Sequence, residues 1–209
     1  FTEMGVCGYQ TQFLERYDSR APEVGFEQPD FDDSSWVPAT VCKHDDHTLT
    51  PQQSAMLTFE EISPVTVQTH GNRLLYDFGS NYVGYLWVKA CGHGGDRVIL
   101  RCAQELNEDG TLRHNLRANC AYEEEWILSD GECELSQYDY KPFRYAELEL
   151  DEGVNVTAVH MQARHNPFTL LADMSPAYAS DPALRKIWEL CVHTQKYGVQ
   201  EVIQDCMER

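Results

Sequence analysis

The sequence predicts a mainly β protein, with an antiparallel β-sandwich over residues 71–165 followed by an α-helix. From about Asn72 the chain repeats short runs of β-branched and aromatic residues, separated by turn residues. The run RYAELEL at 144–150 alternates polar and apolar side chains, as a strand with one wet and one buried face does. After Asn166 the apolar spacing changes to that of an amphipathic helix.

Six runs are predicted as strands, and GHGGD (92–96) is predicted as the hairpin turn between two of them. At least six strands with short turns are typical of an antiparallel sandwich. The link from Gln104 to Cys120 is long for such a fold, so a functional loop and a crossover between sheets both stay open. The predicted strands are residues 73–78, 82–90, 97–103, 122–128, 144–150 and 154–163.

Residues 1–70 are irregular, rich in aromatic residues and interrupted by Pro and Asp. We expect them to be a linker or the end of an accessory β domain. Within them, Phe31 and Trp36 flank an Asp-Asp-Ser-Ser turn. This pattern favours a surface loop pinned by a buried indole, and a piece of an accessory sandwich is the alternative.

The segment 166–209 is expected to be the start of a helical domain. Asp181 is a predicted N-cap and Pro182 occupies the first helical position, which places a helix over 182–196. Its apolar spacing predicts one buried face, so the helix either covers the sandwich or opens a helical domain. The residues of that face are Leu184, Ile187, Trp188, Cys191 and Gln195.

Composition excludes several classes of function. The 209 residues are 42% hydrophobic and 11% aromatic, which is enough for a packed core. A net charge of −18 without a Lys/Arg cluster disfavours nucleic acid and anionic membrane surfaces as partners. No apolar run reaches the roughly 18–20 residues of a membrane span. The first residues lack an initiator Met and a signal peptide, and we expect the chain to be cut at both ends.

The eight cysteines contain no C-x-x-C pair, so neither a zinc ribbon nor a redox pair is predicted. A chain with this much core does not need disulfides, and we expect reduced thiols and a cytoplasmic setting. KHDDHT (43–48) holds metal-ligand residue types, but adjacent side chains splay apart, so a solvated loop is expected there. No nucleophile or phosphate-loop motif is present, and neither a metal nor a cofactor is predicted.

Three stretches, taken in order, resemble the bacterial α-L-rhamnosidases of glycoside hydrolase family 78. Leu75–Leu112 contains D-F-G-x-N-x-x-G, then L-R and E-x-L-x-x-D-G-x-L. Tyr138–Leu150 is similar to the family's F-R-Y-x-E strand. The chain from Ser180 to Arg209 is similar to the first helix of the family's (α/α)6 catalytic barrel, leading into a D-C-P-x-R/Y-E segment.

The resemblance implies an inverting hydrolase that releases terminal α-L-rhamnose from rhamnose-containing glycosides. Asp205 and Arg209 would contact the sugar, and the general-acid Glu would follow within one or two positions of Arg209. Met207 stands where the family has Pro, which leaves the geometry of this turn less rigid. Glu208 lies at the wrong offset for the acid and is not assigned. No catalytic carboxylate is therefore predicted within the chain.

A competing hypothesis is a non-catalytic carbohydrate-binding or structural sandwich. It requires exposed aromatic side chains on a strand face, and Tyr82, Tyr85 and Trp87 are the candidates. Aromatic residues in strands more often pack between sheets. A helix that follows the sandwich and ends in D-C-x-x-R favours the enzyme.

Overall fold

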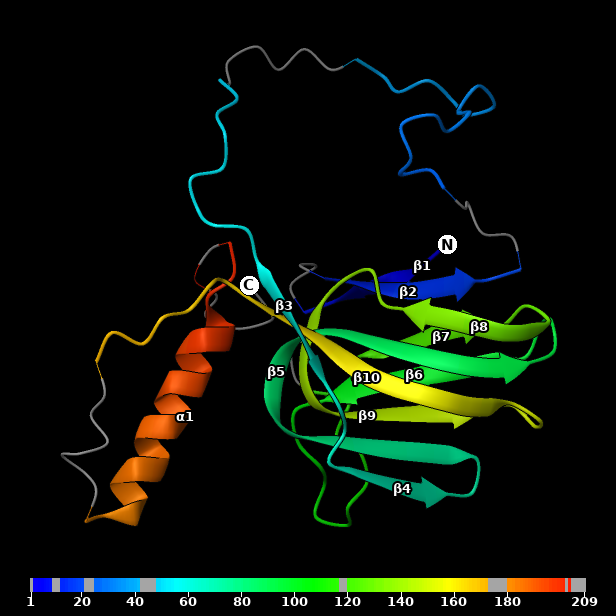
Figure 1. Ribbon diagram of the computed structural model, residues 1–209. Coiled ribbons are helices and arrows are strands. Elements are labelled where there is room, and N and C mark those ends of the chain that lie inside the picture. Colours follow the sequence, from blue (N-terminus) through cyan, green and yellow to red (C-terminus); the bar gives the residue numbers. More distant parts are fainter. Residues whose placement is uncertain are drawn as a thin grey trace.

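The structure, a computed structural model, describes residues 2–8, 12–20, 25–41, 48–116, 120–172, 180–201 and 203. This part of the chain forms ten strands and one helix (Figure 1). They are β1 (Thr2–Cys7), β2 (Gln12–Asp18), β3 (Thr58–Ile62), β4 (Thr66–His70), β5 (Arg73–Gly92), β6 (Arg97–Ala103), β7 (Glu123–Ile127), β8 (Gly131–Ser136), β9 (Lys141–Leu150), β10 (Asn155–His165) and α1 (Pro182–Gly198).

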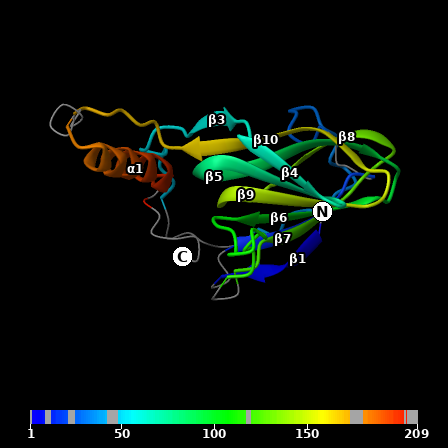
Figure 2. The same cartoon turned by 90° about the horizontal axis from the view of Figure 1, so that it is seen from below.

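The strands pair in the order β1-β2-β7-β6-β9-β5-β10-β3, and β4 and β8 pair with opposite ends of β5. The sheet folds into two layers, with β10 and β3 in one layer and β6, β7 and β1 in the other (Figure 2). All of these pairs are antiparallel except β2 with β7, which run parallel. The predicted sandwich and following helix are confirmed.

β5 is a single strand of 20 residues, where the sequence predicted two strands at 73–78 and 82–90. The register against β9 shifts between Asp77 and Tyr82, so the chain bends there without leaving the sheet. Before the bend β5 pairs with β4 and β9, and after it mainly with β8 and β10. Gly84 lies just past the bend, and a Cβ there would collide with the backbone of Gln162 on β10.

The core lies between the two layers and follows the predicted alternation. On β9, Ala146 and Leu148 are fully buried. Glu147 on the opposite face is buried as well, which the alternation did not predict. It is covered because Arg101 and Arg73 pair with its carboxylate at 3.1 and 3.8 Å. Other core side chains are Phe78, Leu86, Val88, Leu100, Trp126, Leu135 and Phe143.

Two regions differ from their predictions. The strand β8, GECELS, was missed because Glu and Gly have low strand propensity. The link after β6 is not a plain loop, because isolated bridges join Leu106 to Leu112 and Asn115 to Ala121. In addition, strands from residues 2–70 join the same sheet as β5 to β10. The division at residues 70 and 165 stays a prediction.

The helix begins where its capping signals placed it. The Asp181 carboxylate accepts hydrogen bonds from the backbone N–H groups of Ala183 and Leu184, at 2.9 and 3.4 Å. Pro182 occupies the first turn, where its missing N–H costs no helical hydrogen bond. The helix ends at Gly198, two residues beyond the predicted end.

Cys7, Cys91, Cys102, Cys133 and Cys191 are thiols rather than disulfides. Burial raises the pKa of the Cys7 thiol to about 11, so it stays protonated at neutral pH. Within the described ranges no helix is long and apolar enough to cross a membrane. The cytoplasmic setting stays a prediction.

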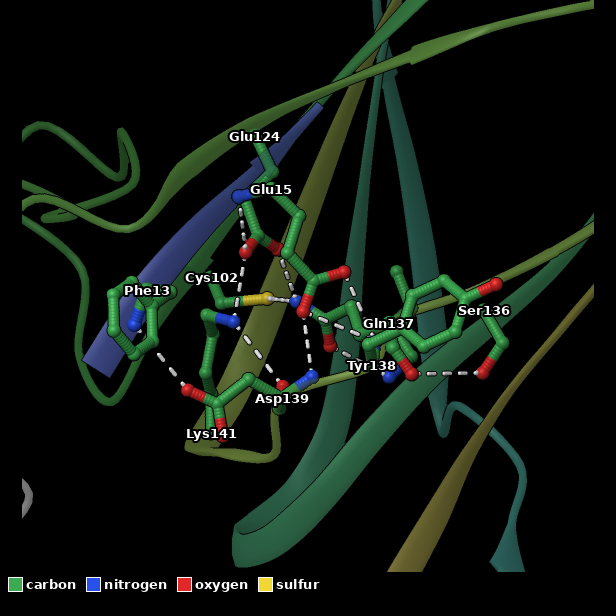
Figure 3. A network of polar contacts seen from close by, with 10 residues as sticks. Phe13, Glu15, Cys102, Glu124, Ser136, Gln137, Tyr138, Asp139 and Lys141 are labelled. Carbon is green, nitrogen blue, oxygen red and sulfur yellow. Dashed lines mark hydrogen bonds and ion pairs between the residues drawn. The ribbon is translucent and has the colours of Figure 1, made fainter. Parts of the chain in front are cut away.

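A buried polar network ties the N-terminal strands to the rest of the sandwich (Figure 3). Glu124 on β7 accepts hydrogen bonds from Lys141 Nζ at 2.7 Å and Gln137 Nε2 at 2.6 Å. Gln137 in turn accepts a bond from the backbone N–H of Leu86 on β5. Glu15 on β2 accepts bonds from the backbone N–H groups that precede β9. The network therefore connects β2, β5, β7 and β9.

The charges of this network are almost fully desolvated. Glu15, Glu124 and Lys141 expose 1%, 1% and 0% of their surface. Burial, and then the negative charge of Glu124, raise the pKa of Glu15 above its usual range. Burial alone would lower the pKa of Lys141, but attraction to Glu124 outweighs it and the pKa is raised. Lys141 is therefore protonated at neutral pH, and its loss would leave the buried Glu124 carboxylate without the cation that pairs with it.

We therefore expect Lys141→Met to reduce the free energy of unfolding by about 3–5 kcal/mol, as breaking a buried ion pair does. Urea unfolding at pH 7 measures this loss. The double variant Lys141→Met with Glu124→Gln should recover part of it, because it removes the unpaired charge. A single variant as stable as the wild type would show that Glu124 finds another partner.

Candidate functional site

The helix contacts the sandwich through its C-terminal end only. Tyr197 is the one buried residue of α1, at 5% exposure, and His193 and Lys196 beside it are half-buried. By contrast, Leu184 and Ile187 expose 41% and 55% of their surface. The prediction that this apolar face is buried is therefore wrong for the part of the chain that the structure describes. α1 stands beside the sheet (Figure 1), and the described residues leave this face uncovered.

The bend of β5 receives the helix. The His193 Nε2 atom lies 2.6 Å from the Asn81 carbonyl oxygen. The Tyr82 ring packs edge-on against His193 and Tyr197, with centroids 5.1 and 5.0 Å away. Edge-to-face packing at these distances is favourable for aromatic rings. The segment Asn81–Tyr82 is thus the docking point on β5.

A second docking point is Glu60 on β3, whose carboxylate gathers three side chains. Its Oε1 atom lies 2.6 Å from Lys196 Nζ and 3.0 Å from His165 Nε2. Its Oε2 atom accepts a hydrogen bond of 2.8 Å from the Tyr197 hydroxyl. Glu60 therefore joins β3, the end of β10 and the last turn of α1.

Electrostatics fix the state of this cluster. Partial burial would raise the pKa of Glu60, but the hydrogen bonds from Lys196, Tyr197 and His165 outweigh it and lower the pKa to about 2. Burial, and then the hydrogen bond to Glu60, raise the pKa of Tyr197 above its usual range. At neutral pH the cluster is a carboxylate surrounded by donors.

A cleft of about 530 Å³ lies beside the docked helix. Its walls combine the aromatic rings of Tyr82, Trp188 and Tyr197 with the carboxylates of Glu60 and Glu189. A glycosidase needs a carboxylic acid that holds its proton near neutral pH. With a pKa of about 2, Glu60 cannot supply one. The cleft marks the joint between α1 and the sandwich.

The motif residues of β5 shape this joint. The Asp77 carboxylate forms a bidentate ion pair with Arg144, with both distances 2.8 Å, and accepts a third bond from the Gly79 N–H. Gly79 has a φ of +83°, a conformation that other residues rarely adopt. Phe78 packs edge-on against Phe143 of β9. The D-F-G and F-R-Y motifs thus meet to hold the bend that presents Asn81 and Tyr82.

After α1 the chain returns to the end of β10. The backbone N–H of Asn166 donates to the Val199 carbonyl at 2.9 Å, and its side chain donates to the Gln200 carbonyl at 3.3 Å. A bridge then pairs Val199 with Ile203. The predicted sugar contacts, Asp205 and Arg209, lie outside the described residues.

KHDDHT also lies outside the described residues, except for Thr48. Among the residues that are described, no group of three or more His, Cys, Asp or Glu side chains could hold a metal ion.

The three aromatic candidates for a sugar platform have different roles. Tyr82 docks the helix, and the Tyr85 hydroxyl accepts a hydrogen bond from Arg164. Trp87 stacks on His160, with centroids 4.5 Å apart, and stays half-buried. They do not form one continuous platform, which weakens the hypothesis of a carbohydrate-binding module.

No pattern in the sequence pointed to Glu60 or His165 as joint residues. Glu60 and Lys196 are 136 positions apart, and no local pattern links them. Tyr197 was the one available hint, because a Tyr in the last helical turn is amphipathic and needs a polar partner when buried.

Comparison with known proteins finds a family that this chain resembles. The family model for the bacterial alpha-L-rhamnosidase concanavalin-like domain matches residues 67–165. This part of the chain is similar to that domain. The predicted resemblance to the bacterial α-L-rhamnosidases is confirmed.

Curated relatives extend the similarity beyond the domain. An alpha-L-rhamnosidase of Streptomyces avermitilis is 29% identical over 74% of this chain and 16% of its own length. One of Alteromonas sp. (strain LOR) is 26% identical over 93% of this chain and 22% of its own length. The chain thus spans less than a quarter of these relatives.

Solved structures show the same fold. An alpha-L-rhamnosidase from Dictyoglumus thermophilum superposes with a TM-score of 0.75 and 22% identity, over 93% of this chain and 23% of its own. The Streptomyces avermitilis alpha-L-rhamnosidase, complexed with L-rhamnose, gives a TM-score of 0.71 and 25% identity over 91% of this chain and 19% of its own. Both matches cover more than nine tenths of this chain.

The Glu60 cluster predicts an acid-sensitive joint. The folded-state pKa of Glu60 is lowered from 4.5 to about 2, so its stabilisation is complete above about pH 4.5 and is lost as pH falls toward 2. Glu60→Gln should therefore lower stability at pH 7 and reduce the loss of stability between pH 4.5 and pH 2.

Urea unfolding at a series of pH values measures both effects. Glu61→Gln is the matched control, because Glu61 is the exposed neighbour on the same strand. Equal pH slopes for the wild type and Glu60→Gln would show that Glu60 does not couple the helix to protonation.

Proposed function

We propose that this chain is the sandwich and first helix of an α-L-rhamnosidase, an enzyme that releases terminal α-L-rhamnose from rhamnose-containing glycosides. The similarity to named α-L-rhamnosidases supports the activity. The described residues supply the joint that orients a helical catalytic domain rather than the reacting groups.

The observation that carries this proposal is the uncovered apolar face of α1. Leu184, Ile187 and Leu190 expose 41%, 55% and 65% of their surface, although the helix is docked. An apolar stripe of this kind marks a contact surface, since burial of apolar area yields about 25 cal/mol per Å². The partner we propose is the next helices of an (α/α)6 barrel.

The chemistry we propose is inverting hydrolysis. One carboxylic acid protonates the leaving oxygen and a second carboxylate activates water, the two being about 6.5–9.5 Å apart. We assign neither carboxylate to the described residues. Asp205 would accept hydrogen bonds from neighbouring hydroxyls of the rhamnose ring, and Arg209 would bind the sugar or hold nearby carboxylates ionised.

The first test is hydrolysis of p-nitrophenyl α-L-rhamnoside by the complete gene product. Residues 1–209 alone should be inactive, because general acid–base catalysis contributes about 10²–10⁴-fold per group and both groups are expected elsewhere. Rhamnoside hydrolysis by residues 1–209 would mean that a site within them does the chemistry.

The second test is Asp205→Asn in the complete protein. It should lower kcat/KM by about 10- to 100-fold, since the amide replaces a charged acceptor that contributes roughly 1.5–3 kcal/mol. Asp32→Asn is the control, because Asp32 is exposed and bonds only within its own loop. Equal losses in both variants would argue against a sugar contact at Asp205.

A further inference from the structure

The cleft between α1 and the sandwich is large enough to hold a small molecule. Its volume is about 530 Å³, and small-molecule sites occupy roughly 300–1,000 Å³. Its walls come from β3, β5, α1 and, through Leu170, the segment that leads into α1. Because the contacts of the joint hold α1 against β3 and β5, the cleft is a preformed space rather than a gap between loops.

Near the end of α1, the polar groups of the cleft are bonded within the protein. Glu60 accepts hydrogen bonds from Lys196 and Tyr197, and His193 lies within hydrogen-bond distance of the Asn81 carbonyl oxygen. These groups hold the joint together, and a ligand would compete with them for the same bonds. A ligand is therefore expected nearer the start of the helix.

Toward the start of the helix, three side chains of α1 line the cleft with unused polar groups. They are Arg185, Trp188 and Glu189. Over the described ranges of the chain, no hydrogen bond or ion pair engages the Arg185 guanidinium, the Glu189 carboxylate or the Trp188 indole N–H. Arg185 and Glu189 are exposed, whereas Trp188 is half-buried. Hydrogen-bond donors and an acceptor thus lie beside an aromatic ring in the same wall.

The face of α1 that lines the cleft is opposite to its uncovered apolar face. Arg185, Glu189 and Val192 recur every three or four positions and so lie on one side of the helix. Ile187 and Leu190 are each two positions from one of these residues, which is a rotation of about 200° in an α-helix. The helices that cover Ile187 and Leu190 in the proposed function would therefore approach α1 from the side away from the cleft.

The charges of the cleft favour a neutral ligand. With histidine neutral, its charged lining residues are two acids and two bases, Glu60, Glu189, Arg185 and Lys196. The cleft thus has no formal net charge, although the whole chain carries −18. Neither a simple anion nor a simple cation gains from such a balance, whereas a neutral molecule with many hydroxyl groups bonds to both signs.

We propose that this cleft binds a neutral saccharide, an L-rhamnose unit. The apolar C–H face of the sugar ring would pack on Trp188, since small-molecule sites combine aromatic walls with a few polar groups. Arg185 would donate to hydroxyl oxygens through its planar fork, and Glu189 would accept bonds from hydroxyl groups. The choice of rhamnose among neutral sugars rests on the proposed function.

Fluorine NMR of the complete protein, labelled with 5-fluorotryptophan, tests the site directly. The Trp188 resonance is the one that Trp188→Phe removes. It should shift and saturate as L-rhamnose is added. D-glucuronate should need a higher concentration for the same shift, because burying its carboxylate costs desolvation that a site without net positive charge does not offset.

The variant that isolates the site is Arg185→Gln. It should weaken L-rhamnose binding at this resonance by about tenfold or more, since hydrogen bonds from a charged donor are the stronger kind. Lys186→Gln is the matched control, because Lys186 is an exposed base next to Arg185 that does not line the cleft. Equal dissociation constants in the two variants, or tighter binding of D-glucuronate than of L-rhamnose, would overturn the inference.

Binding and hydrolysis are measured separately, so the two proposals fail independently. A protein that binds L-rhamnose at Trp188 but does not hydrolyse p-nitrophenyl α-L-rhamnoside would contradict the proposed function and keep the site. Hydrolysis by a protein whose Trp188 resonance L-rhamnose leaves unmoved would contradict the inference and keep the proposed function.

Discussion

The ion pair between Asp77 and Arg144 holds the bend of β5, and the arrangement of the molecule depends on that bend. Because β5 changes partners there, one strand serves both layers of the sandwich. The same bend turns the Asn81 carbonyl and the Tyr82 ring toward α1. The Arg144 hydrogen bonds lower the pKa of Asp77, so the pair stays charged at neutral pH. Sheet closure and helix docking therefore share one local cause.

Lys and Arg side chains connect several segments that lie far apart in the sequence. The chain has 16 Lys and Arg against 34 Asp and Glu, so acids compete for every cation. Three buried or half-buried cations lie where distant segments meet: Lys141 between β7 and β9, Arg164 between β10 and the segment after α1, and Lys196 between α1 and β3. Desolvated pairs of this kind specify partners more than they add stability, because removal from water offsets much of the attraction.

Features that depend on neighbouring residues in the sequence could be predicted, whereas contacts between distant residues could not. Strand-forming runs located β6, β7 and β10, alternation located β9, and the Asp181-Pro182 cap located the start of α1, because these signals are local. The joint could not be predicted, since Glu60, Arg164 and their partners meet only after the sheet has formed. Apolar spacing identified the face of α1 correctly but not its burial, because a pattern does not say whether a partner lies within reach. The predicted sugar contacts rested on the resemblance, and they lie outside the described residues.

The chemistry of the joint suits a contact that must fix direction. A helix that merely covered the sandwich would lay Leu184 and Ile187 on the sheet, yet these side chains point away and polar and aromatic groups make the contact. Apolar contacts are non-directional, whereas ion pairs and hydrogen bonds hold a specified geometry. With Glu60 at one end of the joint and Arg164 at the other, α1 is held at two separated points, which restrains rotation about either one. In the proposed function, the exposed apolar face of α1 is the surface that further helices would cover, and the two points would set their orientation relative to the sandwich.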